Sequence, residues 1–142
     1  MIVLRVRYDI DMRILQVRHG EAKLFDLKFA TTGCILSESF EGATAYMSPE
    51  MLSCKEYTQK TDIYSVAICL WELWYGRPVY SRPYILGHAH LLKSVTDGRR
   101  PSCDCRIAMP PALQATVSDC WKVLSDQRPE ANQVAIEIRK IK

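Results

Sequence analysis

The strongest constraint on the fold is an apolar segment between Asp62 and Tyr75. Hydrophobic side chains recur there at offsets of 0, 3, 4, 7, 8 and 11, the spacing of one helix face: Ile63, Val66, Ala67, Leu70, Trp71 and Trp74. The other faces are apolar too, since they carry Tyr64, Ile68, Cys69 and Leu73. We expect Thr61 to cap this helix, Gly76 to end it, and other elements to pack on several of its sides.

Three further segments have helical spacing. One runs from Ile85 to Thr96, and the other two open near Pro111 and Pro129, because proline is favoured in the first turn of a helix. The expected inward faces are Leu113, Val117, Cys120, Trp121 and Leu124 in the helix after Pro111, and Ala131, Val134, Ile138 and Ile141 in the helix after Pro129. The sequence therefore predicts a mainly helical domain.

A small β-hairpin is predicted ahead of these helices. Short apolar runs at residues 14–17 and 22–25 flank Gly20, which suits a tight turn. From Leu27 to Gly42 the chain is rich in Ser, Thr and Gly and has little periodicity, which predicts a long irregular segment. Loops of that length are typically functional or disordered.

Length and composition suit one ordinary globular domain. Its 142 residues are 48% hydrophobic and 25% charged, and the net charge of +3 is spread along the chain rather than gathered into a basic patch. No apolar run approaches the roughly 20 residues that span a bilayer, and no secretory signal follows Met1. We therefore expect no nucleic-acid or membrane partner, and a cytoplasmic location.

The cysteines are interpreted as reduced thiols. The chain is larger than the usual disulfide-stabilised scaffold and shows no export signal. Cys103-Asp-Cys105 lacks a second Cys or His pair at ligand spacing, so a metal site is not expected there.

Four motifs, read in order, resemble the C-terminal lobe of a eukaryotic protein kinase. They are Lys23-Leu-Phe-Asp26-Leu-Lys28, Gly42-Ala-Thr-Ala-Tyr46-Met-Ser48-Pro49-Glu50, Asp62-Ile-Tyr-Ser and Asp126-Gln-Arg128-Pro129. The resemblance implies a catalytic-loop remnant and hairpin at 5–27, an activation segment at 26–50 and a helical subdomain at 51–142. Around Tyr46 the sequence is more similar to the serine/threonine and tyrosine-kinase-like branches than to true tyrosine kinases.

The resemblance also implies roles for individual residues. Glu50, which closes Ser48-Pro49-Glu50, is expected to form a buried ion pair with Arg128. Asp62 resembles the family's aspartate that hydrogen-bonds the catalytic-loop backbone, although a carboxylate in a first turn also favours the helix dipole. Asp26 resembles the Mg²⁺ ligand of such domains. The implied cofactors are ATP and Mg²⁺, and the implied partner is a protein substrate.

The catalytic loop departs from the family pattern. One alignment puts Tyr8 and Arg13 where the family has its catalytic Asp and metal-binding Asn, and neither residue suits that chemistry. A one-residue deletion instead makes Asp9 the base and leaves no Asn. Lys28 replaces the glycine of the family's Asp-Phe-Gly. Nothing before Arg5 resembles a Gly-rich loop or its lysine, so the resemblance covers about half of a kinase domain and the N-lobe segment is the expected missing partner.

Two functions therefore stay open, with a third as their alternative. The first is phosphoryl transfer from ATP to protein Ser/Thr, or Tyr, with this chain inactive when isolated. The second is a pseudokinase-like interaction module, in which Glu50, Asp62 and Arg128 preserve the fold after the chemistry is lost. The third is an unrelated helical adaptor.

Overall fold

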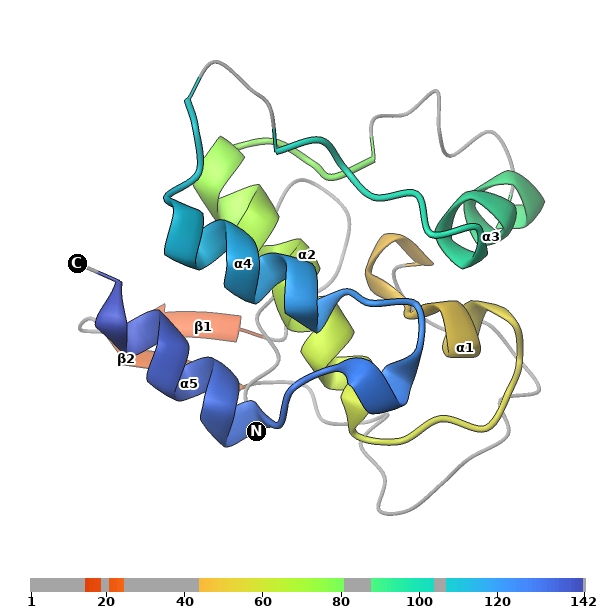
Figure 1. Cartoon of the computed structure of the whole chain (residues 1–142), viewed down its shortest axis with the longest axis horizontal. Coiled ribbons are helices and arrows are strands. Elements are labelled where there is room, and N and C mark those ends of the chain that lie inside the picture. The colour runs from red at the N-terminus through yellow and green to blue at the C-terminus, as the bar shows by residue number, and fades with distance from the viewer. Residues whose placement is uncertain (1–14, 19–20, 25–43, 81–87, 104–106, 142) are drawn as a thin grey trace.

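The computed structural model describes residues 15–18, 21–24, 44–80, 88–103 and 107–141, and this part of the chain is mainly helical (Figure 1). Two short strands come first, β1 (Leu15–Arg18) and β2 (Glu21–Leu24). A 3₁₀ helix, η1 (Thr44–Tyr46), then leads into α1 (Pro49–Leu52) and α2 (Lys60–Tyr75). The chain continues through α3 (His88–Thr96), α4 (Pro111–Cys120), the 3₁₀ turn η3 (Ser125–Gln127) and α5 (Ala131–Lys140).

The two strands pair antiparallel, with a register that runs from Leu15 opposite Leu24 to Arg18 opposite Glu21. The turn expected at Gly20 lies outside the described residues, so the complete hairpin stays a prediction. The irregular segment predicted between Leu27 and Gly42 also falls outside them.

α2 is the centre of the helical part of the chain (Figure 1). Tyr64, Ala67, Ile68 and Cys69 are fully buried, and α4, η1 and η3 all contact this helix. The predicted central apolar helix is thus confirmed. Leu73 is the exception on its surface, with 51% of the residue exposed.

The structure confirms the predicted end of α2 but not its predicted cap. Gly76 ends the helix as expected, in the left-handed conformation (φ 62°) that glycine adopts without strain, and its amide donates to the Glu72 carbonyl at 2.8 Å. Thr61 is not the cap, because the helix already begins at Lys60. The hydroxyl of Thr58 accepts the Lys60 amide at 3.3 Å, and the Thr61 hydroxyl instead donates to Glu50.

α4 begins at Pro111, as the sequence predicts, and packs against both α2 and α5. Its inward side chains Leu113, Val117 and Cys120 are buried, as is Trp121 just beyond the helix. The prediction was wrong for Leu124, which is 56% exposed. The helix ends at Cys120, so the 3.6-residue period no longer applies at Leu124.

α3 and α5 complete the helical layer. α3 contacts α1, and its Leu91 and Val95 are buried; the predicted residues 85–87 of this helix lie outside the described part. α5 begins with a capping box, in which the side chain of Gln133, the third residue of the helix, accepts the amide of the N-cap residue Glu130 at 2.7 Å. Its predicted inward face is confirmed, since Val134 is buried and three partly buried residues pack on the core: Ala131, Ile138 and Ile141.

Candidate functional site

The candidate site is the place where the segment that ends at Glu50 is fastened to the helical core. Pro49 occupies the first position of α1, where its fixed φ suits a helix start, and Ser48 before it is fully buried. Glu50 follows in the first turn, with 12% of its side chain exposed. A nearly buried carboxylate is thereby placed against the first turn of α2.

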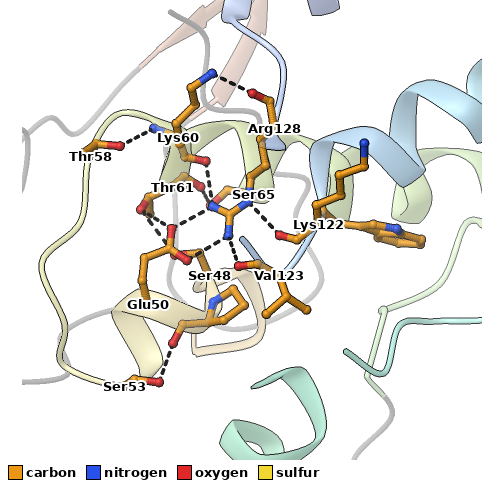
Figure 2. Close-up of polar contacts among 12 residues, drawn as sticks. Ser48, Glu50, Ser53, Thr58, Lys60, Thr61, Ser65, Lys122, Val123 and Arg128 are labelled. Carbon is orange, nitrogen blue, oxygen red and sulfur yellow. Dashed lines mark hydrogen bonds and ion pairs between the residues drawn. The ribbon is translucent and has the colours of Figure 1, made fainter. Parts of the chain in front are cut away.

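Glu50 and Arg128 form a two-pronged ion pair across 78 positions of sequence (Figure 2). Arg128 Nη1 donates to Glu50 Oε1 at 2.7 Å, and Nη2 donates to Oε2 at 2.8 Å. This parallel arrangement matches the planar guanidinium to the planar carboxylate and is the stronger form of such a contact. The structure therefore brings together the two residues that the sequence analysis paired.

Every N–H group of the Arg128 side chain is used. Besides its two bonds to Glu50, the guanidinium donates to the Lys122 carbonyl at 2.8 Å, the Lys60 carbonyl at 3.0 Å and the Val123 carbonyl at 3.1 Å. These bonds account for all of the donors that arginine has, and none of the side chain is exposed. The charge of Arg128 is therefore buried, but each of its N–H donors has an acceptor, and Glu50 is its counter-ion.

The first turn of α2 supports the pair from the side. The Lys60 carbonyl accepts from Arg128, and the Lys60 Nζ in turn donates to the Arg128 carbonyl at 2.6 Å. The same Nζ also contacts Glu130 Oε1 at 2.6 Å. The Thr61 hydroxyl donates to Glu50 Oε1 at 3.0 Å and accepts from the buried Ser48 hydroxyl at 3.3 Å. Three separate segments of chain thus meet at one carboxylate.

The electrostatics of Glu50 follow from two opposing effects. Burial alone would raise the pKa of this carboxyl, but the hydrogen bonds and positive charge of Arg128 outweigh it. The pKa of Glu50 is therefore lowered, and the side chain is held as a carboxylate. Removing one partner of such a buried pair typically costs about 3–5 kcal/mol, because the other charge is left buried alone.

A second contact, at Tyr46, holds the same segment against α2. Tyr46 in η1 donates its hydroxyl to Glu72 Oε2 at 2.6 Å, while Glu72 Oε1 accepts the Val79 amide at 2.8 Å. The Ser65 hydroxyl donates to the Tyr46 carbonyl at 2.9 Å. Glu72 is a buried residue of α2, so residues 46 and 50 are both tied to this helix by carboxylates.

The remaining predicted site residues are placed differently. Asp9, the expected base, and Asp26, the expected Mg²⁺ ligand, lie outside the described residues. Asp62 is in the first turn of α2, half-buried, and its burial raises the pKa of its carboxyl. The backbone that the resemblance pairs with Asp62 belongs to the catalytic-loop remnant, which the structure does not describe.

Lys60, Thr61 and Glu72 are residues of this site whose roles the sequence analysis missed. Glu72 carried the clearest signal, since it is an isolated carboxylate between Trp71 and Leu73 on a helix that is apolar nearly all round. A buried acid in such a helix needs a partner. Nothing local indicated that the partner would be Tyr46, 26 positions away.

The described part of the chain shows neither a metal-binding cluster nor a membrane-spanning helix. No three His, Cys, Asp or Glu side chains gather there in a way that could hold a metal ion. The cysteines described as free thiols are Cys54, Cys69, Cys103 and Cys120. None of the described helices is both long and apolar enough to cross a bilayer.

This geometry defines a helical module whose early and late parts are joined by a buried glutamate–arginine pair. The family model for the protein kinase domain matches residues 11–137, which is most of the chain. The chain belongs to the protein kinase domain family. Members of this family use ATP and Mg²⁺ to transfer a phosphoryl group to proteins.

The relatives with significant similarity include serine/threonine-protein kinases. The probable serine/threonine-protein kinase gdt2 of Dictyostelium discoideum is 39% identical over 89 residues, and the serine/threonine-protein kinase VIK of Arabidopsis thaliana is 31% identical over 103 residues. The mitogen-activated protein kinase kinase kinase mom-4 of Caenorhabditis briggsae is 33% identical over 116 residues. The three alignments cover 62%, 71% and 80% of this chain but only 5%, 22% and 20% of the relatives.

Proposed function

We propose that this chain forms the helical C-terminal lobe of a protein kinase domain and supports phosphoryl transfer from ATP to Ser or Thr residues of a protein substrate. The observation that carries the proposal is the two-pronged pair of Glu50 and Arg128, which fastens the end of the 26–50 segment to the last helices. In this proposal residues 5–27 are the catalytic-loop remnant and hairpin, residues 26–50 the activation segment and residues 51–142 the helical subdomain.

The described residues would contribute positioning rather than bond chemistry. Phosphoryl transfer depends mainly on holding the reactants in place and on stabilising charge. Tyr46 and Glu50, each bonded to a partner on or beside α2, would keep the end of the activation segment in one conformation. Asp26 would hold Mg²⁺, which when bound offsets phosphate charge, and Asp9 would accept the proton of the substrate hydroxyl.

The test is an assay of the longest natural reading frame that contains this chain together with a nucleotide-binding lobe. Mg²⁺-dependent transfer of the ATP γ-phosphoryl group to a Ser/Thr protein substrate is expected, and Asp26→Ala should abolish it. Glu50→Gln should reduce transfer strongly, whereas Glu130→Gln, a matched change at a side chain that is 53% exposed, should leave it nearly unchanged. Absence of transfer in the unmodified protein, or identical activity in Asp26→Ala, would refute the proposal.

A second function is favoured by the residues at the catalytic positions. Tyr8, Arg13 and Lys28 replace groups that the chemistry of the family uses, which suggests a pseudokinase-like interaction module. Such a module is expected to show no transfer in the same assay and no thermal stabilisation by Mg²⁺-ATP. A nucleotide present at 100 times its Kd would add about 2.7 kcal/mol to the stability of a protein that binds it only when folded. Clear stabilisation would therefore count against this second function.

A further inference from the structure

Arg128 shares its surroundings with a second arginine, Arg100. The guanidinium carbon of each lies over the ring of Tyr64, 5.2 Å from the ring centroid. Tyr64 is a fully buried residue of α2. Because protein interiors are close-packed, a ring in this position cannot shift without moving its neighbours. Arg100 and Arg128 are therefore linked through one rigid side chain.

The two arginines also hold the same stretch of backbone, immediately after α4. Arg100 Nε donates to the Trp121 carbonyl at 2.7 Å. Arg128 Nε donates to the next carbonyl, that of Lys122, at 2.8 Å, and its Nη2 donates to the Val123 carbonyl at 3.1 Å. Three consecutive carbonyls thus accept from two guanidinium groups. The bond at Trp121 therefore helps to set the position of the two acceptors that Arg128 uses.

Arg100 is fixed in turn by the end of α3. The helix closes with Gly98 in the left-handed conformation (φ 80°), and the Arg99 amide donates to the Ser94 carbonyl at 2.9 Å. Immediately after this turn, Arg100 Nη1 donates to the Val95 carbonyl at 2.9 Å and to the Arg99 carbonyl at 2.7 Å. Carbonyls at the C-terminal end of a helix favour a cation. One guanidinium thus joins the ends of α3 and α4 to α2.

The two cations of this cluster differ in their acceptors. Arg128 pairs with the Glu50 carboxylate, whereas the acceptors that the described residues provide for Arg100 are backbone carbonyls. Since both guanidinium carbons lie 5.2 Å from one ring centroid, the two positive charges are close enough to repel each other. Neutralising Glu50 would leave that repulsion uncompensated. The effect of losing Arg100 should therefore depend on the charge at residue 50.

We propose that Arg100 is a positioning residue for the ion pair of Glu50 and Arg128. It fixes the Tyr64 ring and the Trp121 carbonyl, and through them it holds Arg128 in the orientation that meets both carboxylate oxygens. The end of α3 is thereby coupled to α1, where Glu50 lies. A change that displaces the end of α3 is expected to loosen η1 and α1. This coupling is a property of the fold and does not depend on phosphoryl transfer.

A double-mutant cycle between Arg100→Met and Glu50→Gln tests the coupling. Methionine keeps a long unbranched side chain but removes the charge and the hydrogen-bond donors. Each single change should raise the unfolding equilibrium constant in urea titrations of the chain. The double variant should fall short of the product of the two effects by more than about twofold, because both changes act on Arg128.

Arg77→Met is the matched control for this cycle. The guanidinium carbon of Arg77 lies over two rings of the same helix, 5.2 Å from the centroid of Trp71 and 5.9 Å from that of Tyr75. Arg77 is exposed, however, and lies beyond the C-terminal end of α2. Its effect on the unfolding constant should multiply with that of Glu50→Gln to within about twofold, as independent sites do.

Amide hydrogen exchange gives a second measurement that needs no double variant. Arg100→Lys keeps a charge but loses the planar fork. Exchange of the Leu52 and Ser53 amides, which close α1, should accelerate at least about twofold more than exchange in the middle of α2, which corrects for global stability. If Arg100 only caps α3 and α4, exchange accelerates near residues 95–100 and 117–123 but not in α1. That outcome would overturn the proposal, as would a double variant of Arg100→Met and Glu50→Gln that matches or exceeds the product.

Discussion

At the scale of single residues, the Arg128 side chain is completely buried, and all of its N–H groups form hydrogen bonds. A guanidinium in that position is tolerable only because backbone carbonyls accept its protons and Glu50 neutralises its charge. Five acceptors in fixed directions also make the site selective for arginine. A lysine, with one compact ammonium group, cannot reproduce this fork.

Glu50→Gln tests how much the fold depends on this charge. The amide keeps the shape of the side chain but leaves Arg128 buried without a counter-ion. We expect a loss of about 3–5 kcal/mol in the free energy of unfolding, measured by urea titration. Glu130→Gln, which removes the charge of the exposed contact with Lys60 but keeps an amide oxygen for the capping box of α5, should cost no more than about 1 kcal/mol. Equal losses in the two variants would show that the pair is not the source of stability.

The pKa of Glu50 makes a separate prediction about acid. Because the folded-state pKa is lowered, the stabilisation is fully present above the unfolded carboxyl pKa of about 4.3 and is lost as pH falls toward the folded value. The difference in unfolding free energy between the unmodified chain and Glu50→Gln should therefore shrink steadily below about pH 4.3. A difference that stays constant down to pH 2 would contradict the assigned electrostatics.

At the scale of elements, η1 and α1 are too short to be stable by themselves. Isolated helices need roughly 12–15 residues to be even marginally stable in water, whereas these elements have 3 and 4. They persist because Tyr46 and Glu50 bind carboxylate or guanidinium partners, and because Ser65 on α2 holds the Tyr46 carbonyl. The contacts with α2 and with Arg128 therefore keep η1 and α1 folded.

Tyr46→Phe is expected to loosen this region without unfolding the core. The change removes a 2.6 Å hydrogen bond to a charged acceptor, a contact worth about 1.5–3 kcal/mol. Amide hydrogen exchange within residues 44–52 should become faster, while exchange within α4 should stay the same. Tyr75→Phe provides the control, since it loses a bond of the same length at the other end of α2. Faster exchange of residues 44–52 in both variants would argue against a local anchor.

At the scale of the whole molecule, the described helices share a single apolar core. The buried cluster includes side chains from α1, α2, α3, α4 and α5, with Leu52, Ile68, Val95, Val117 and Val134 among them. The ion pair between Glu50 and Arg128 links α1 to the segment that precedes α5 in the same unit. No helix therefore has a separate core on which it could stay folded alone.

This arrangement predicts one cooperative unfolding transition for the helical part. Far-ultraviolet circular dichroism reports the helices. Fluorescence reports the three tryptophans, Trp71 and Trp74 on α2 and Trp121 at the end of α4. The two signals should change at the same denaturant concentration. Midpoints that differ beyond experimental error would mean that α2 and the C-terminal helices unfold as separate units.

The helices could be predicted because their signals are local. The period of apolar side chains located α2, Gly76 marked its end and Pro111 marked the start of α4. Prediction failed at Thr61 and Leu124 for the same reason. A local pattern does not reveal that a hydroxyl will be drawn to a distant carboxylate, or that a helix will stop at Cys120 before its apolar stripe ends.

The amino-acid sequence by itself determined the helical class of the protein, the family to which it belongs and the pairing of Glu50 with Arg128, which the motif order implied. Only the tertiary structure decided which groups complete that pair: the carbonyls of Lys60, Lys122 and Val123 and the hydroxyl of Thr61. Backbone carbonyls occur at every residue, so no side-chain pattern can single out the three that will accept these protons. That choice arises from the packing of distant segments against α2, where burial makes every unpaired polar group costly.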